Sequence, residues 1–371
     1  MIRIDRTMLL AQIRRQLRVF DLPLLCALAL LVATSLFTMY SAASDYDGRM
    51  LDHARNLSIA FVLMWAAANL PLNWMMRSAV PIYLLGLALL IAVAIFGDIA
   101  KGARRWLDLG FTRIQPSELM KIAMPLMLAW YFQKRANAAR WYDFAIATVL
   151  LLVPVLLIAR QPDLGTSLLV ASAGICVIYL AGLPWKVIAA SIVAGIGALP
   201  LLWMVMHDYQ RQRVMMLLDP TSDPLGKGFH IIQSEIAVGS GGLWGKGWLD
   251  GTQAHLEFVP ERTTDFVFAV FAEEFGLVGN GVLLLVYLLI IGRGLVIAAN
   301  GATVFARLLA GAITLIVFTY AFVNMGMVTG ILPVVGVPLP LMSYGGTAMV
   351  TLGLGLGLLM SVSRQRRLLR S

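Results

Sequence analysis

"TTDFVFAVFAEEFGLVGNGVLLLVYLLIIG", residues 263–292, decides how this chain folds. The polar residues end at Asp265, and the chain from Phe266 onward is almost entirely hydrophobic apart from Glu273 and Glu274. Charged groups are costly in hydrocarbon. We therefore expect a membrane-spanning helix to begin beside Asp265. The charged cluster before it either marks the membrane boundary or performs chemistry there.

The composition of the whole chain supports a membrane protein. Hydrophobic residues make up 60% of the 371 residues and charged residues only 13%, which is too little charge to cover a water-soluble surface of this size. The net charge of +9 comes from basic residues that are scattered or terminal. This distribution indicates membrane topology rather than nucleic-acid binding.

A membrane-spanning helix needs roughly 20 apolar residues. Ten segments of the sequence fit this description. The fold class that we expect is therefore an all-α polytopic membrane protein, with residues 1–371 forming a single integral membrane domain. The ten segments are 22–41, 57–74, 79–96, 117–132, 144–160, 164–183, 187–206, 266–291, 307–329 and 343–361.

Lysine and arginine predict the orientation, because cytoplasmic flanks of membrane spans are enriched in them. Both termini are basic, residues 1–21 and residues 362–371, so both are expected in the cytoplasm. The segments 42–56, 98–116, 207–265 and 330–342 then face outward. The segment 98–116 nevertheless carries four cations, which indicates a use for positive charge outside: Lys101, Arg104, Arg105 and Arg113.

The outer segment 207–265, between the seventh and eighth spans, is the only connection long enough to build a site. Its stretch "FHIIQSEIAV", residues 229–238, predicts a short helix on the membrane surface. The following "GSGGLWGKGWLDG", residues 239–251, fails the phosphate-binding P-loop pattern, because Gly247 follows Lys246 where serine or threonine is required. We interpret it as a tight turn with close backbone packing.

Two charged positions attract functional interpretations. Asp265 is suited to cap the helix that follows it, and it is equally suited to accept a proton from a substrate held at the membrane edge. Glu118 and Lys121 lie three residues apart on one face of the fourth span, just after Pro116, which suits a first helical turn. They can neutralise each other, but ionisable residues at membrane depth usually face a cavity, so we favour function.

The remaining polar residues have simpler interpretations. Arg211 and Arg213, just outside the seventh span, are suited either to lipid headgroups or to a phosphate-bearing ligand. We expect Asp163 to cap the sixth span. We expect Glu273 and its neighbour Glu274 to pair inside the bundle. The four histidines show no metal-ligand spacing. Glycines of "SYGGTAMVTLGLGLG", residues 343–357, are best explained by helix packing.

Topology adds one physical expectation. Even-numbered spans run from outside to inside, so their positively polarised N-termini face outward, where they attract anions. The cationic side chains expected beside them are Arg113, Lys121, Arg211 and Arg213. Residue chemistry alone therefore predicts a polytopic protein that handles an anionic amphiphile at its outer face.

Seven ordered blocks resemble the signatures of the SEDS family (shape, elongation, division and sporulation), and of its elongation members in particular. They extend over nearly the whole chain from the first span onward. They read "KGARRWLDLG", "RIQPSELMKIA", "QPDLGTS", "HDYQRQRVMMLLDP", "GSGGLWGKGWLDGTQ", "PERTTDFVFAVFAEEFGLVG" and "GILPVVGVPLPLMSYGG".

The resemblance implies a ten-span peptidoglycan glycosyltransferase that polymerises lipid II at the outer face of the cytoplasmic membrane during cell elongation. It implies a class B penicillin-binding protein and other elongation-complex proteins as partners, a divalent cation (Mg²⁺ or Mn²⁺) and no organic cofactor. The family's essential aspartate falls on Asp265 and its cavity-lining pair on Glu118 and Lys121. Its loop arginines fall on Arg113 and on Arg211 and Arg213 of "YQRQR".

Two alternatives remain open from the sequence. A lipid II flippase would also need a polar cavity and many spans, whereas a scaffold that only recruits the penicillin-binding protein would need no cavity. For the enzyme, Asp265 would deprotonate the acceptor 4-hydroxyl, which attacks C1 of the donor sugar. The cationic residues would stabilise the departing diphosphate.

Overall fold

The computed structural model describes residues 20–370, apart from 101–102, 109–112, 136–139, 207, 224–226, 257 and 260. Ten long helices dominate the described chain. They are α2 (Leu22–Ala42), α3 (Arg49–Ala68), α4 (Leu72–Phe96), α5 (Pro116–Lys134), α6 (Trp141–Arg160), α7 (Leu164–Leu180), α8 (Trp185–Val205), α12 (Val267–Ala299), α13 (Val304–Val328) and α14 (Gly346–Arg370).

Each of these helices overlaps one of the ten predicted apolar segments, in the same order. By length and hydropathy, six described helices can cross a membrane: α2, α4, α6, α12, α13 and the part Gly346–Gln365 of α14. α7 and most of α8 are apolar but shorter, and α3 and α5 carry charged side chains. The all-α membrane fold is confirmed, while the count of ten spans stays a prediction.

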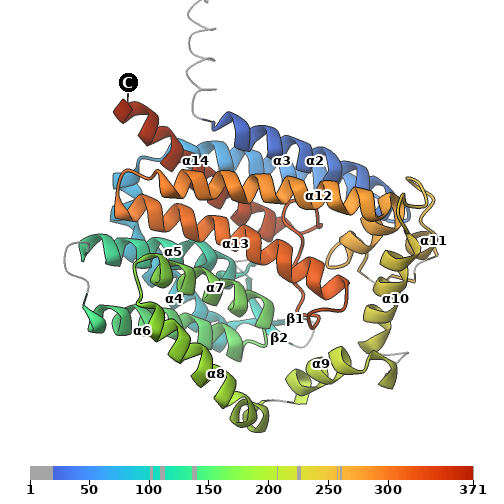
Figure 1. Ribbon diagram of the computed structural model, residues 1–371, viewed down its shortest axis with the longest axis horizontal. Coiled ribbons are helices and arrows are strands. Elements are labelled where there is room, and N and C mark those ends of the chain that lie inside the picture. The colour runs from blue at the N-terminus through green and yellow to red at the C-terminus, as the bar shows by residue number, and fades with distance from the viewer. Residues whose placement is uncertain are drawn as a thin grey trace, which may run out of the picture.

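The bundle has central and peripheral helices. In the apolar parts of α13 and α14, 72% of the residues are buried, against 28–39% in α2, α4, α6 and α12. The poorly buried helices therefore face lipid, and α13 and α14 form the centre. Figure 1 shows the C-terminus at one end of the long helices and α10 (Lys227–Ser240) and α11 (Thr252–His255) at the other, with α8 along the periphery.

The helix α3 begins and ends earlier than predicted. The sequence indicated a span over 57–74, but the helix covers Arg49–Ala68, and Pro71 precedes α4, which starts at Leu72 rather than near residue 79. The polar first turns of α3 had been assigned to a loop because they are not apolar. They form a helix nonetheless, and this end of α3 packs against α2, where the buried His53 lies with its Nε2 2.8 Å from Ser35 Oγ.

A small antiparallel sheet occupies the segment that the sequence indicated only as an outer loop. Strands β1 (Asp98–Ala100), β2 (Ala103–Asp108) and β3 (Arg113–Ile114) are ordered β1-β2-β3. Gln115 then occupies the N-cap position of α5 without a side-chain capping bond, and the first helical residue is Pro116, as predicted. The sheet thus determines where α5 starts.

A break at Gly276 divides α12, which was predicted as one span over 266–291. Gly276 has φ 63° and ψ −163°, outside the helical region. Before it, 267–274 are buried on every side, whereas many side chains of 277–299 are exposed to lipid. At 1.5 Å per residue, 277–299 extends about 35 Å, which suffices for roughly 30 Å of hydrocarbon. The exposed part of α12 therefore starts later than the predicted span, and 267–274 packs inside the protein.

The glycine-rich turn fills this break, and we call residues 241–247 the glycine hook. Its amides Lys246 N and Gly247 N donate to the carbonyls of Glu273 and Glu274 at 3.0 and 3.1 Å. Its carbonyls accept from the amides of residues 277 and 278 at 2.9 and 3.0 Å. The backbone groups that a broken helix leaves without partners are thus satisfied, and the predicted tight turn with close packing is confirmed.

The predicted close packing of the last span is confirmed too. A Cβ on Gly353 would lie 2.5 Å from the carbonyl oxygen of Ala60, and one on Gly357 would lie 2.3 Å from that of Met64. Only glycine permits α14 to approach the α3 backbone so closely.

Candidate functional site

Lys121, Glu118 and Tyr320 form a buried polar cluster between α5 and α13. Lys121 Nζ lies 2.6 Å from Glu118 Oε1 and also donates to the Tyr320 hydroxyl. The side chains of Lys121 and Glu118 are only 2% and 12% exposed. The predicted pair is therefore confirmed as a pair. Glu118 Oε2 is buried and has no hydrogen-bond partner among the described residues.

Asp265 lies in a turn before α12 and does not cap it. The helix starts at Val267, its N-cap is Phe266, and no side chain caps it. The amides of Thr264 and Phe266 both bond to the carbonyl of Glu261, and this turn delays the helix start. The interpretation of Asp265 as an N-cap is therefore wrong, because the turn places Asp265 one position too early.

Two loops and a helix hold the segment around Asp265. Asn324 Nδ2, from α13, donates to the Asp265 carbonyl at 2.8 Å and to the Val337 carbonyl at 2.7 Å. The Tyr344 amide donates to the Thr263 carbonyl at 2.7 Å. A Cβ on Gly336 would lie 3.5 Å from Asp265 Oδ2. The carboxylate of Asp265 therefore lies against the turn at residues 335–337.

Two arginines fasten the same segment to the end of α2 and the start of α3. Arg262, 2% exposed, donates to the Ala42 carbonyl at 3.0 Å and lies 2.6 Å from the Asp45 carboxylate. Arg49 Nη1 donates to Thr263 Oγ1 at 2.6 Å. Both guanidinium groups lie over the ring of Tyr46, at 5.2 and 4.2 Å. These contacts fix residues 262 and 263, just before Asp265, against the connection between α2 and α3.

The polar cluster and Asp265 share one face of α13. Tyr320 and Asn324 are four residues apart and therefore lie one above the other on the helix. Tyr320 contacts Lys121, and Asn324 contacts Asp265. One helical turn, about 5.4 Å, thus separates Tyr320 from Asn324 along α13. The same helix therefore contacts three of the predicted site residues or their neighbours: Lys121 directly, Glu118 through Lys121, and the backbone of Asp265.

The start of α7 borders the same place. Asp163 caps α7 by accepting from the Thr166 amide at 3.2 Å, which confirms its predicted role, and it also accepts from Gln115 Nε2 at 2.9 Å. A Cβ on Gly165 would lie 2.7 Å from the Val335 carbonyl oxygen. The α7 N-terminus therefore already has an anionic partner, namely the carboxylate of Asp163.

The arginines predicted to join the site lie farther out. Arg113 lies on β3, with an exposed side chain 3.3 Å from the Asp108 carboxylate. Arg211 lies on α9 (Asp208–Leu218) and donates to the carbonyls of Trp203 and Met204 at the end of α8. Figure 1 shows α9 well apart from α5 and α13. The side chain of Arg213 lies outside the described residues.

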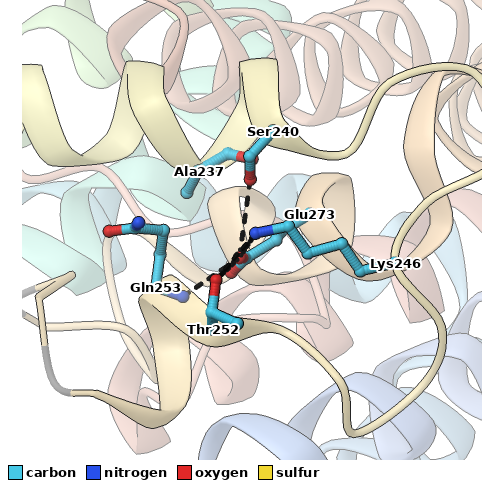
Figure 2. Close-up of polar contacts among 6 residues, drawn as sticks. All are labelled: Ala237, Ser240, Lys246, Thr252, Gln253 and Glu273. Carbon is cyan, nitrogen blue, oxygen red and sulfur yellow. Dashed lines mark hydrogen bonds and ion pairs between the residues drawn. The ribbon is translucent and has the colours of Figure 1, made fainter.

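Glu273 bonds to several elements of the 227–255 segment, as Figure 2 shows. It is fully buried, and its Oε1 lies 2.7 Å from Lys246 Nζ, 3.2 Å from Thr252 Oγ1 and 3.0 Å from the Gln253 amide. It lies 3.5 Å from Ser240 Oγ of α10. The expected pairing of Glu273 inside the protein is confirmed, and the pair joins α10, α11 and the glycine hook to α12.

Sequence reasoning missed Tyr320, Asn324, Arg49 and Tyr344 as members of the site. Each lies in a different sequence block from the residue that it contacts, and an asparagine in an apolar helix shows no local pattern. The isolated Asn324 inside the ninth apolar segment was the one available signal, because polar side chains at membrane depth are costly.

The described residues contain no group of three or more histidine, cysteine, aspartate or glutamate side chains that could hold a metal ion. Glu118 Oε2 is the one acidic oxygen of the Lys121 cluster that could serve as a ligand. A cation held by protein side chains alone does not fit this site.

Comparisons with known proteins agree on the relatives of this chain. The family model FTSW_RODA_SPOVE, described as "Cell cycle protein", matches residues 15–368. The peptidoglycan glycosyltransferase MrdB of Escherichia coli K12 is 53% identical over 93% of this chain and 94% of its own length. A probable peptidoglycan glycosyltransferase FtsW of Geobacter metallireducens is 34% identical over 95% and 97%.

Solved structures show the same architecture. A structure titled "Structural coordination of polymerization and crosslinking by a peptidoglycan synthase complex" contains a chain that superposes with a TM-score of 0.81 at 34% identity, covering 94% of this chain and 98% of that one. The crystal structure of the rod shape determining protein RodA of Thermus thermophilus superposes with a TM-score of 0.71 at 31% identity, covering 94% and 97%.

Proposed function

This chain belongs to the FTSW_RODA_SPOVE family, and on that premise we propose that its polar site is the active site of a peptidoglycan glycosyltransferase. It polymerises lipid II into β-1,4 glycan strands at the outer face of the cytoplasmic membrane. The observation that supports the assignment is the shared helix α13, where Tyr320 binds Lys121 and Asn324, one turn farther along, binds the Asp265 backbone carbonyl.

Asp265 is the general base of this reaction. It takes the proton of the acceptor 4-hydroxyl, whose oxygen forms a bond to C1 of the donor sugar. The bond from C1 to the diphosphate oxygen breaks at the same time, and its electron pair leaves with the lipid diphosphate. One displacement converts the α-linkage of the donor into the β-linkage of the product, so one base suffices. Since Asp265 does not cap α12, this assignment does not compete with a helix-capping role.

The Lys121 cluster binds the polar part of the substrate. Glu118 Oε2 has no protein partner among the described residues, so it accepts a hydrogen bond from a substrate hydroxyl or amide. Lys121 holds Glu118 in place and supplies positive charge on the side of the departing diphosphate. Its buried position makes that charge effective, because a low-dielectric site strengthens electrostatic interactions.

Arg113 meets the diphosphate at the outer entrance. Its pair with Asp108 is largely exposed, and exposed pairs contribute little to stability, so the guanidinium can exchange Asp108 for phosphate at small cost. We place Arg211 and Arg213 in the same role only if α9 moves toward the bundle, since the Arg211 guanidinium is bonded at the end of α8.

The test is polymer formation by purified Asp265→Asn on defined lipid II. Loss of a positioned base lowers the rate about a hundredfold to ten-thousandfold, while lipid II binding and thermal stability should match the parent. Asp219→Asn is the control, because Asp219 is another aspartate of the 207–265 segment and caps the short helix η1 (Pro220–Ser222), a role that asparagine fills equally well. Near-normal polymerisation by Asp265→Asn removes Asp265 from the mechanism. The same assay separates an enzyme from a flippase or a scaffold, neither of which makes polymer.

The topology and partner also belong to the proposal. We place both termini in the cytoplasm, so that the 207–265 segment and Asp265 face outward. The partner is a class B penicillin-binding protein, which is supported by the likeness to a chain of a peptidoglycan synthase complex. Co-purification from membranes and faster polymerisation by the pure pair are expected. Equal polymerisation rates with and without the partner would show that the partner does not activate this protein.

A divalent cation, if one takes part, arrives with the substrate diphosphate. Mg²⁺ is commonly held by one or two carboxylates together with substrate phosphates, and the described side chains offer no protein-only cage. Mn²⁺ should therefore bind the purified protein only when lipid II is present, as measured by electron paramagnetic resonance. Equal binding without lipid II would show a protein-only site.

A further inference from the structure

We propose that Asn324 is a positioning residue for the general base, holding Asp265 and the turn opposite its carboxylate in one fixed arrangement. The inference rests on the proposed function of Asp265 and deepens it. It assigns a chemical role to a side chain that lies inside an apolar helix and does not contact the reacting atoms.

The geometry at Asn324 is specific to its amide. Its two Nδ2 hydrogens reach two carbonyl oxygens, those of Asp265 at 2.8 Å and Val337 at 2.7 Å. Since a carboxylate has no hydrogen to donate, aspartate at this position would place a negative oxygen against two carbonyl oxygens. The side chain is fully buried, so water cannot replace either bond.

The oxygen of the same amide indicates why an asparagine occupies this position. Asn324 Oδ1 is buried and has no hydrogen-bond partner among the described residues. An unsatisfied buried acceptor costs free energy, and a leucine would avoid that cost in this otherwise apolar helix. The two donated bonds are therefore the reason for an asparagine here.

The two bonds act on opposite sides of the base. Asp265 lies in a turn before α12, outside the regular hydrogen bonding of that helix. Its carboxylate oxygen Oδ2 lies close to Gly336, the neighbour of Val337. Asn324 thus ties the backbone that carries the base to the turn that the base faces. A displacement of 1 Å at a reacting group can cost about a hundredfold in rate.

A purely structural alternative is that Asn324 only anchors the 337–345 loop. Tyr287 of α12 anchors the same loop at a different place. Its buried hydroxyl donates to the Pro340 carbonyl at 2.8 Å. Tyr287→Phe removes that bond and keeps the ring. It is therefore the matched control for loss of a buried bond to the same loop.

The experiment measures kcat and KM of purified Asn324→Leu on lipid II beside Tyr287→Phe. We expect kcat of Asn324→Leu to fall tenfold to a hundredfold with KM unchanged, and kcat of Tyr287→Phe to stay at the parent value. Equal falls in both variants, or a change confined to KM, would overturn the proposal. If Asn324→Leu does not accumulate, Asn324→Gln keeps the donor but moves it by one methylene. A lowered kcat of that variant supports the proposal, and the parent value refutes it.

Coupling to Asp265 separates this inference from the proposed function. If Asn324 acts through the base, adding Asn324→Leu to Asp265→Asn leaves the residual single-turnover rate unchanged, because residues that act as a unit are not additive. A further fall equal to that of the single variant would show an independent role. Near-normal activity of Asp265→Asn would instead refute the proposed base, whatever Asn324 does.

Discussion

Replacing Lys121 by methionine tests how much the buried ion pair between Lys121 and Glu118 contributes to stability. The substitution keeps the volume and removes the cation that lies 2.6 Å from Glu118 Oε1. Glu118 is then a charge without its partner, and Tyr320 loses the bond from Lys121. Removing one member of a buried ion pair typically costs about 3–5 kcal/mol.

Two features of the structure place Lys121→Met at the lower end of that range. Glu118 is 12% exposed, so water reaches part of its carboxylate. It also lies in the first turn of α5, where the helix dipole favours negative charge by about 0.3–1 kcal/mol. We therefore expect a loss of about 3 kcal/mol in the free energy of unfolding.

The assay is denaturant unfolding in detergent micelles, with Glu118→Gln and the double variant measured alongside. Glu118→Gln leaves Lys121 as the unpaired buried charge, whereas the double variant leaves none. The double variant should therefore lose at least about 2 kcal/mol less than the sum of the two single variants, since contacting residues couple by up to about 3 kcal/mol. Polymerisation should fall in both single variants. Strict additivity of the unfolding free energies would refute the pairing argument.

Three further predictions concern the outer part of the protein. Burial lowers the pKa of His230, which stacks on Phe266, so the folded state disfavours the protonated ring and loses stability as the pH falls below 6.5. His230→Phe should therefore reduce the fall in thermal stability between pH 7.5 and 5.5. An unchanged fall would show that His230 is not its cause. Gly245 has φ +83°, and a Cβ added there would lie 2.0 Å from the Glu274 carbonyl oxygen, whereas a Cβ added at Gly239 meets open space. Gly245→Ala should therefore lower the amount of protein in the membrane, measured by immunoblotting, and Gly239→Ala should not. A cysteine at Thr252 should react with an impermeant thiol reagent in intact spheroplasts, and one at Ser371 only after permeabilisation; the reverse pattern would invert the topology.

Much of the fold was predictable because lipid imposes a simple rule on sequence. Apolar runs such as 22–41 and 307–329 correspond closely to α2 and α13, since a helix that faces hydrocarbon must be apolar along its length. The rule fails where a helix end is surrounded by protein. The buried segment 267–274 of α12 departs from the predicted span for this reason.

The candidate site was predictable only in its ionisable residues. Glu118, Lys121 and Asp265 stand out because charge is rare at membrane depth. The side chains that arrange them, Tyr320 and Asn324, come from a helix about 60 to 200 residues away in sequence. Such contacts depend on how helices pack, which no local pattern encodes. The predicted capping role of Asp265 failed for a smaller reason, a turn that begins at Glu261.

The glycine hook has a consequence for the biogenesis of the protein. Its residues precede α12 in the chain, so they are synthesised before the segment 277–299. The amides and carbonyls that bond on either side of Gly276 therefore exist before the second part of α12 is made. The break in the helix is completed by a segment from the N-terminal side, so its hydrogen-bond partners do not wait for any later part of the chain.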